Sequence, residues 1–226
     1  MARAGVFRLG GTVVGTQAFK LYEAELAVRL GETDLTQTGD IDIAQFEQLS
    51  LALGDRVEEN LAETFKTLDF DPISGICTTS IWKWRQTTSM AVVEFLTSSF
   101  RPEEDIRELP ALGVAAQSLH FLSYLIAEPI KATALYRSGV LVQILRPEAY
   151  AVHKLIVANR RTGPDRLKSR KDRAQAALLI EALAEDRPDE LREAYADAKE
   201  RGPQWRAHLG ATLKRMPETA AKLAAL

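Results

Sequence analysis

The chain has 226 residues, of which 46% are hydrophobic and 27% are charged, and its formal net charge is −2 at pH 7. This composition predicts a globular protein of one large domain or two small ones, and it excludes a surface that is basic all over, as a general nucleic-acid binder would have. The single cysteine, Cys77, excludes an internal disulfide framework, and the three isolated histidines make a structural zinc site unexpected. No apolar run reaches the ~20 residues of a membrane-spanning helix, and the N-terminus lacks the apolar core of a signal peptide. We therefore expect a cytoplasmic protein with no membrane partner.

The first two thirds of the chain mix strand and helix patterns. Residues 6–9 are expected to form a short strand ending at Gly10-Gly11, and Thr12 is expected to cap a helix over residues 13–30. We then expect a strand at 40–43, an apolar segment at 46–53 whose secondary structure the pattern does not decide, a helix at 55–68 and extended chain at 70–76. A hairpin of strands 81–86 and 90–97 is expected next, followed by a charged loop at 102–110. Residues 119–125 are expected to form a helix or a strand, and residues 132–135 and 140–144 are expected to form strands.

Helix formers dominate from Pro147 onward, and strand signals disappear. We expect helices at 147–159, 167–184, 188–201 and 203–215, followed by a frayed tail after Pro217. The pattern predicts an α+β fold, with a mixed β-sheet and flanking helices followed by an all-helical C-terminal region. The predicted domains are residues 1–146 and 147–226.

Two aspartates stand one residue apart in the apolar run 38–43. Because side chains alternate between the faces of a strand, Asp40 and Asp42 are expected on one face, while Ile41 and Ile43 point into a core. Like charges held side by side repel each other, and a divalent cation such as Mg²⁺ offsets that cost well. The alternative from these residues alone is a solvated strand edge with two surface aspartates.

Two further features fit the same chemistry. The Gly10-Gly11-Thr12 segment, placed between a strand and a helix, would offer backbone amides and a helix N-terminus to an anion such as a triphosphate. Glu94 interrupts an otherwise apolar strand and should have a partner. That partner is either a metal shared with Asp40 and Asp42 or a neighbouring Lys or Arg, unless Glu94 lies at an exposed edge.

A basic segment follows in the helical region. Helical spacing puts Tyr150, Lys154 and Val157 on one face, so Lys154 is a cation on a largely apolar face. Asp172, one helix later, is a candidate partner for it. The surrounding cations, Arg160, Arg161, Lys168 and Arg170, form either a solvated surface or a local phosphate-binding patch. Trp82 and Trp84 share a strand face, where packing in the core is favoured over stacking on bases.

Taken together, these motifs resemble those of the DNA polymerase β-like nucleotidyltransferase superfamily. The resemblance rests on Gly10-Gly11 before a helix, on Thr38-x-Asp40-x-Asp42, and on the later strand Val93-Glu94-Phe95-Leu96-Thr97. The segment His153-Lys154-Leu155-Ile156-Val157 and the triplet Arg170-Lys171-Asp172 are similar to those of a bacterial branch that includes abortive-infection toxins. The resemblance spans nearly the whole chain and implies a nucleotidyltransferase-type fold.

The resemblance also implies roles for these residues. Asp40 and Asp42 would bind Mg²⁺ or Mn²⁺, and Glu94 would be the third carboxylate, assisting metal binding or deprotonating the attacking hydroxyl. Gly10, Gly11 and Thr12 would hold the phosphates of a nucleoside triphosphate. Lys154 would neutralise phosphate charge. The implied reaction moves a nucleoside monophosphate from the triphosphate to a hydroxyl of RNA, a protein or a small molecule.

Two departures from the superfamily pattern keep an alternative open. Glu94 stands where many members have aspartate, and Gly11 is separated from Asp40 by a long segment in which residues 31–37 are expected to loop out. A catalytically inactive module of the same fold, which binds a nucleotide or a partner through its helical region, is the alternative function. Both functions are compatible with a homo-oligomer.

Overall fold

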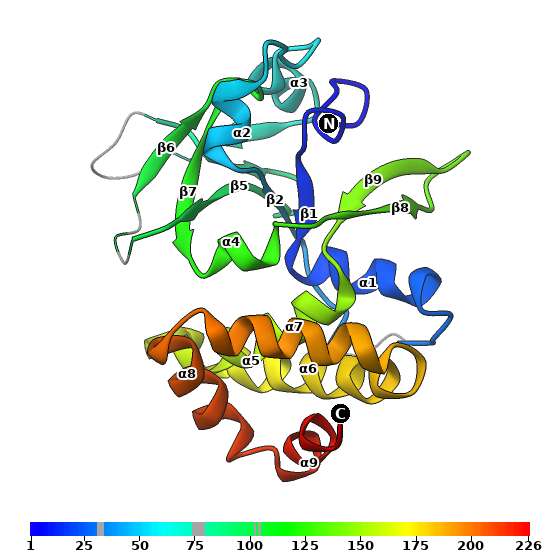
Figure 1. Cartoon of the computed structure of the whole chain (residues 1–226). Helices are drawn as coiled ribbons and strands as arrows, with labels where there is room; N and C mark the ends of the chain where they lie inside the picture. The colour runs from blue at the N-terminus through cyan, green and yellow to red at the C-terminus, as the bar shows by residue number, and fades with distance from the viewer. Residues whose placement is uncertain (31–33, 74–79, 102, 104) are drawn as a thin grey trace. The chain divides into compact units, whose positions relative to one another are not determined.

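The computed structural model of the protein describes residues 1–30, 34–73, 80–101, 103 and 105–226 (Figure 1). The chain packs into two compact units. The sheet unit contains Met1–Leu21 and Gln37–Leu145, and the helical unit contains Tyr22–Thr36 and Arg146–Leu226. The predicted division into domains at residues 1–146 and 147–226 stays a prediction.

The sheet unit is built on a mixed sheet with nine strands among the described residues. Its main path runs in the order β3-β4-β5-β2-β1-β9-β8, while β7 pairs with β5 and carries β6. The strands are β1 (Thr12–Val14), β2 (Asp40–Ala44), β3 (Phe70–Pro72), β4 (Lys83–Gln86), β5 (Val92–Ser99), β6 (Ile106–Leu109), β7 (Val114–His120), β8 (Ile130–Ala134) and β9 (Val140–Ile144). The helices that begin in or belong to this unit are α1 (Gly15–Glu25), α2 (Glu47–Ala52), α3 (Leu61–Thr67) and α4 (Leu122–Leu125).

An aromatic cluster fills the core on one face of this sheet. Phe65 from α3 lies with its ring centroid 5.0 Å from that of Trp84, and Trp84 meets Phe95 edge-on at 5.6 Å. The helix that supplies Phe65 begins at Asn60, whose side chain accepts hydrogen bonds from the amides of Ala62 and Glu63. Trp84 is 3% exposed, which confirms the expectation that it packs in the core.

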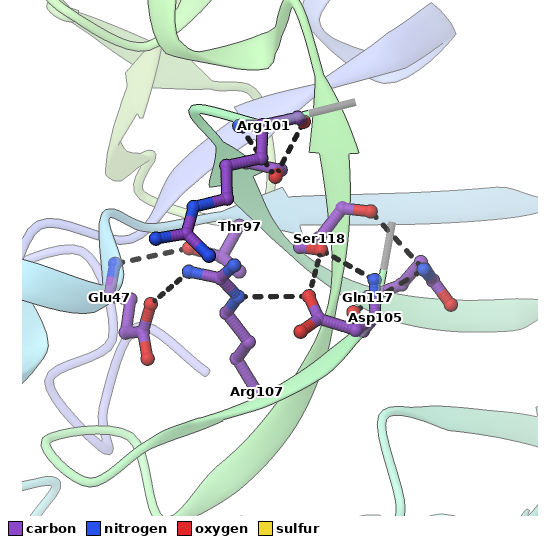
Figure 2. A network of polar contacts seen from close by, with 8 residues as sticks. Glu47, Thr97, Arg101, Asp105, Arg107, Gln117 and Ser118 are labelled. Atoms are coloured by element: carbon purple, nitrogen blue, oxygen red, sulfur yellow. Dashed lines mark hydrogen bonds and ion pairs between the residues drawn. The ribbon is translucent and has the colours of Figure 1, made fainter. Parts of the chain in front are cut away.

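A network of ion pairs and hydrogen bonds holds β6 and β7 to α2 (Figure 2). Arg107 on β6 donates to Glu47 Oε2 at 2.8 Å and to Asp105 Oδ1 at 2.9 Å. Ser118 on β7 also donates to Asp105 Oδ1, at 2.6 Å. The Ser118 hydroxyl, followed by Arg107, lowers the pKa of Asp105. The amide of Glu47 donates to Thr97 on β5, so the network ties α2 to three strands of the sheet.

The helical unit contains five α-helices among its described residues after Arg146. They are α5 (Pro147–Arg160), α6 (Arg166–Asp186), α7 (Pro188–Glu200), α8 (Pro203–Leu213) and α9 (Pro217–Ala225), with a short 3₁₀ helix, η1 (Gly163–Asp165), before α6. Four of these α-helices begin with proline in the first turn, where the missing amide costs no hydrogen bond. In the core of this unit, Tyr22 and Tyr150 meet edge-on with ring centroids 5.4 Å apart. The Tyr150 hydroxyl donates to Gln175 at 3.0 Å.

The predicted α+β class is confirmed, with its mixed sheet, flanking helices and helical C-terminal region. The expected strand at 40–43, the hairpin of 81–86 with 90–97, and the strands near 132–135 and 140–144 are all present. Phe70 begins β3 as expected, while residues 74–76 and Cys77 lie outside the described residues. The segment 119–125 splits between the end of β7 and α4, and 46–53 is helical at α2.

Several expected elements are wrong. Residues 6–9 lie in turns, and the strand follows them at β1, so the helix begins at Gly15 rather than at residue 13. The helix expected from Asp55 begins only at Leu61. The expected charged loop contains β6, and the expected frayed tail is the helix α9. Among the described residues, no helix is long and apolar enough to cross a membrane.

Candidate functional site

The acidic strand has the predicted alternation. On β2, Ile43 is fully buried, whereas Asp40 is exposed and Asp42 is partly exposed on the opposite face. The amide of Asp40 donates to the Thr38 hydroxyl at 3.1 Å, which fixes the chain where the strand begins. The strand therefore holds two carboxylates on one accessible face, while Ile43 and Ala44 anchor it in the core and Ile41 is partly exposed.

Glu94 joins the same face from the neighbouring strand. β2 and β5 are parallel, and their register places Asp42 directly opposite Glu94. Residues paired in this way project from the same side of the sheet, so Asp40, Asp42 and Glu94 share one face.

The structure also shows an ion-pair partner for Glu94. Lys83 on β4 is opposite Glu94 in the antiparallel ladder, and its ammonium forms an ion pair with Glu94 Oε1. The two side chains are 27% and 22% exposed. This is the neighbouring-lysine alternative that the sequence left open for Glu94.

The residues present fit a divalent cation in part. Mg²⁺ in proteins is commonly held by one or two carboxylates together with substrate phosphates and water. Asp40 and Asp42 can supply these two carboxylates. Within the described ranges, no group of three His, Cys, Asp or Glu side chains is arranged to hold a metal ion. Because Lys83 competes for the oxygen of Glu94, the role of Glu94 as a third ligand stays a prediction.

Gly15 brings the start of α1 against Asp42. Its φ is +65°, in the left-handed region that glycine adopts readily, and a Cβ built there would lie 2.3 Å from Asp42 Oδ2. The first amides of a helix have no partner within the helix and carry positive partial charge. The junction of β1 and α1 thus places anion-binding amides beside one of the two aspartates.

The expected phosphate-binding residues lie elsewhere. Gly10 and Gly11 precede β1 instead of following a strand. β1 runs antiparallel to β2, and it is Val14, at the far end of β1 from these glycines, that lies opposite Asp42, whereas Thr12 lies opposite Ala44. The Thr12 hydroxyl donates to the Gly10 carbonyl at 3.3 Å.

Packing explains why residue 11 is glycine. A Cβ on Gly11 would come within 2.6 Å of Val6, so glycine is needed there for packing. The roles of Gly10, Gly11 and Thr12 in holding phosphates stay predictions, and the helix N-terminus that lies against Asp42 is at Gly15 instead. The β-branched residues Thr12, Val13 and Val14 directly before Gly15 are the sequence signal for this junction.

In the helical unit, Lys154 is buried and paired. Its ammonium lies 2.6 Å from Asp172 Oδ1, with the two side chains 11% and 3% exposed, so the expected pairing is confirmed. Arg161 donates to the other oxygen of Asp172 at 2.8 Å. Burial alone would raise the pKa of Asp172, but the two cations outweigh it and lower that pKa. Lys154 and Arg161 thus share the single carboxylate of Asp172.

Comparison with known proteins gives the chain its family. A family model described as nucleotidyltransferase matches residues 1–200. No curated protein matches the sequence. Among solved structures, an antigenic nucleotidyltransferase-like protein from Paracoccidioides brasiliensis is 16% identical, with a TM-score of 0.39, over 93% of this chain and 92% of that one. The family match covers most of the sequence, and the chain therefore belongs to a nucleotidyltransferase family.

Proposed function

We propose that the protein transfers a nucleoside monophosphate from a nucleoside triphosphate to a hydroxyl group, with Mg²⁺ or Mn²⁺ held by Asp40 and Asp42. The observation that carries the proposal is that the N-terminus of α1 at Gly15 lies against Asp42, on the strand face that Asp42 shares with Asp40. Carboxylates bind the cation, and helix amides bind phosphate, so the two halves of a metal–triphosphate complex have matching partners within one unit. Membership in a nucleotidyltransferase family supports the same substrate class.

In this reaction the acceptor oxygen attacks the α-phosphorus, and the bond from that phosphorus to the oxygen bridging to the β-phosphate breaks. Pyrophosphate leaves, and the proton of the hydroxyl passes to a nearby base, for which Glu94 is our candidate. A bound divalent cation supplies charge stabilisation for the attacking and leaving oxygens. Asp40 and Asp42 position that charge, and the amides following Gly15 orient the phosphates. Little covalent chemistry remains for the protein beyond this positioning.

The remaining assignments are also proposals. Lys154 is our candidate for neutralising phosphate charge, although its ammonium is balanced by Asp172 within its own unit. The acceptor is RNA, a protein hydroxyl or a small molecule, and we retain the abortive-infection branch as the proposed neighbourhood of the family. The inactive module is the weaker candidate, because the matching family is described as one of transferases.

Nucleotide incorporation tests the site assignment. Each of the four labelled nucleoside triphosphates is incubated with the purified protein and a cell lysate, with Mg²⁺ or with EDTA, and labelled macromolecules are separated from small molecules. We expect Asp40→Asn with Asp42→Asn to reduce incorporation by about 100-fold or more, since the metal's charge stabilisation is lost. A double variant that incorporates label as well as the wild type would refute the assignment.

A matched control separates this loss from a general effect of charge. Asp69→Asn with Asp71→Asn removes two carboxylates spaced in the same way at β3, in the same unit. This variant should retain activity within about twofold, as surface substitutions do. Equal loss of activity in both variants would show that net charge, rather than the β2 site, controls the reaction.

A further inference from the structure

A polar pocket lies entirely within the helical unit. It has a volume of about 450 Å³ and opens to solvent between α5, η1, α6 and the end of α8. Four arginines contribute to its lining, namely Arg161, Arg166, Arg173 and Arg215. None of the lining residues in the described part of the chain is acidic. The pocket and the carboxylate site share no residue, because the carboxylates belong to the sheet unit and all the pocket residues belong to the helical unit.

Interhelical hydrogen bonds build the walls of this pocket. The buried Ser169 hydroxyl on α6 donates to the Ala158 carbonyl on α5 at 2.6 Å, and Arg173 Nη1 donates to Ser169 Oγ at 2.8 Å. The buried Thr212 hydroxyl on α8, which does not itself line the pocket, donates to the Leu155 carbonyl on α5 at 2.7 Å. These bonds fix the three helices against one another, so the arginines project from a preformed framework.

The positive charge of this pocket is only slightly compensated. Asp172 balances Arg161, but it is shared with Lys154. Among the residues that the structure describes, the guanidinium groups of Arg166 and Arg215 have no hydrogen-bond or ion-pair partner. Four guanidinium groups line the pocket, and the carboxylate of Asp172, itself shared with Lys154, pairs with only one of them. Concentrating so much positive charge is electrostatically costly, and an anionic ligand offsets that cost.

We propose that this pocket binds the phosphate groups of an oligophosphate ligand without a metal ion. Guanidinium groups match phosphate oxygens in pairs of parallel hydrogen bonds, and four of them suit several phosphates better than one carboxylate. The volume lies within the range of pockets that hold nucleotide-sized ligands. The phosphates belong either to a free nucleotide or to a nucleic-acid strand.

Calorimetry with inorganic triphosphate tests the shared chemistry. The full chain is titrated in EDTA, so that metal-dependent binding at Asp40 and Asp42 does not contribute and failure here leaves the proposed transferase function untouched. We expect Arg166→Gln with Arg215→Gln to weaken binding by about tenfold or more, because two charge-assisted contacts are lost. In the described part of the chain neither guanidinium has a partner that would support the fold, so the variant should keep the thermal stability of the wild type.

A second double variant is the matched control. Arg206→Gln with Lys214→Gln removes two exposed cations from α8 and its C-terminal end, in the same unit, and neither residue lines the pocket. This control should bind inorganic triphosphate within about twofold of the wild type. The absence of triphosphate binding in the wild type, or an equal loss in both double variants, would overturn the proposal.

Competition identifies the source of the phosphates. A nucleoside triphosphate and a single-stranded RNA oligonucleotide are each added to the complex with inorganic triphosphate, again in EDTA. Displacement by the nucleotide alone assigns the pocket to a free nucleotide, and displacement by RNA as well assigns it to a strand. If neither displaces inorganic triphosphate, the pocket is no site for a nucleotide-derived ligand, and the proposal fails.

Discussion

Gly15 lies so close to Asp42 that a side chain at Gly15 would overlap the carboxylate, with its Cβ 2.3 Å from Oδ2. The close approach joins the first turn of α1 to the acidic strand β2. Glycine allows this contact in two ways, because it has no Cβ and because it adopts the observed φ of +65° without strain.

We predict that Gly15→Ala lowers both stability and nucleotide transfer. The backbone term alone costs about 1–2 kcal/mol for a non-glycine residue in the left-handed region, and the overlap with Asp42 adds to it. Gly113→Ala is the control, since Gly113 has a φ of +64° and, apart from its chain neighbours, no described residue comes within 4 Å of the position that its Cβ would take. Unfolding in denaturant should show a similar backbone cost for the two variants. Initial rates of transfer should fall only in Gly15→Ala. Equal activity of the two variants would contradict the role given to this contact.

The ion pair of Lys83 with Glu94 makes a prediction about metal affinity. Lys83→Met removes a cation next to the carboxylate face and releases Glu94. Removing that repulsion is worth about 1 kcal/mol, so Mn²⁺ should bind about fivefold more tightly. Mn²⁺ titration followed by electron paramagnetic resonance measures the change.

The double variant Lys83→Met with Glu94→Gln tells whether Glu94 is responsible. It should bind Mn²⁺ about as the wild type does, because the released carboxylate is gone. If Lys83→Met leaves Mn²⁺ affinity unchanged, Glu94 is not a ligand when released.

The network around Arg107 makes a prediction about stability. Arg107→Met leaves Glu47 and Asp105 without their shared cation in a partly buried site, where the Arg107 side chain is 26% exposed. We expect a loss of about 1–2 kcal/mol in the free energy of unfolding, measured with urea. Arg192→Met breaks the exposed pair with Asp189 and should cost less than about 0.5 kcal/mol. The reverse order of the two losses would contradict the structural role of the network.

His153 predicts how stability depends on pH. Burial, followed by the positive charges of Lys154, Arg160 and Arg161, lowers the pKa of His153 to about 3, despite the opposing charge of Asp172. Between that value and the ordinary 6.5, the unfolded chain binds a proton that the folded chain does not. The free energy of unfolding therefore falls as the pH falls, by up to about 1.4 kcal/mol per pH unit.

The variant His153→Gln should flatten this dependence below about pH 6.5. The lowered pKa of Asp172 acts in the same direction, with stability lost as the pH falls below the range in which this carboxyl is ordinarily ionised. Urea unfolding at a series of pH values measures the slope, and imidazole resonances in NMR report the titration itself. A His153 imidazole that titrates near 6.5 in the folded protein would contradict the prediction.

Periodicity predicted the elements whose sequences are locally consistent. The alternation at Asp40–Ala44 predicted the face shared by the two aspartates, and helical spacing predicted that Lys154 is a cation on an apolar face, for which Asp172 was the candidate partner. β7 was missed because its alanines have weak strand propensity, and its extended form depends on pairing with β5. Pro217 was interpreted as a break, although it occupies the first turn of α9.

Two apolar residues of the segment 6–9 are buried without forming a strand, and this explains why the glycine turn before the helix was predicted at the wrong position. Val6 and Leu9 are 0% and 2% exposed, so their apolar pattern reflects packing of the turns before β1 rather than a strand. With that strand in error, Gly10-Gly11 was assigned the junction that Gly15 in fact occupies. The partner of Glu94 depended on the register of β4 with β5, which no local pattern fixes. The pocket with four arginines depends on the packing of α5, α6 and α8, which periodicity does not give.

The position of the transferred label tests the central claim most directly. The protein is given a nucleoside triphosphate labelled at the α-phosphate or at the γ-phosphate, with Mg²⁺ and a lysate that supplies acceptors. Nucleotidyl transfer predicts that acceptors gain only the α-label, that pyrophosphate carries the γ-label, and that the Asp40→Asn with Asp42→Asn variant abolishes both. Acceptors that gain the γ-label, or α-labelling that persists in the double variant, would contradict it.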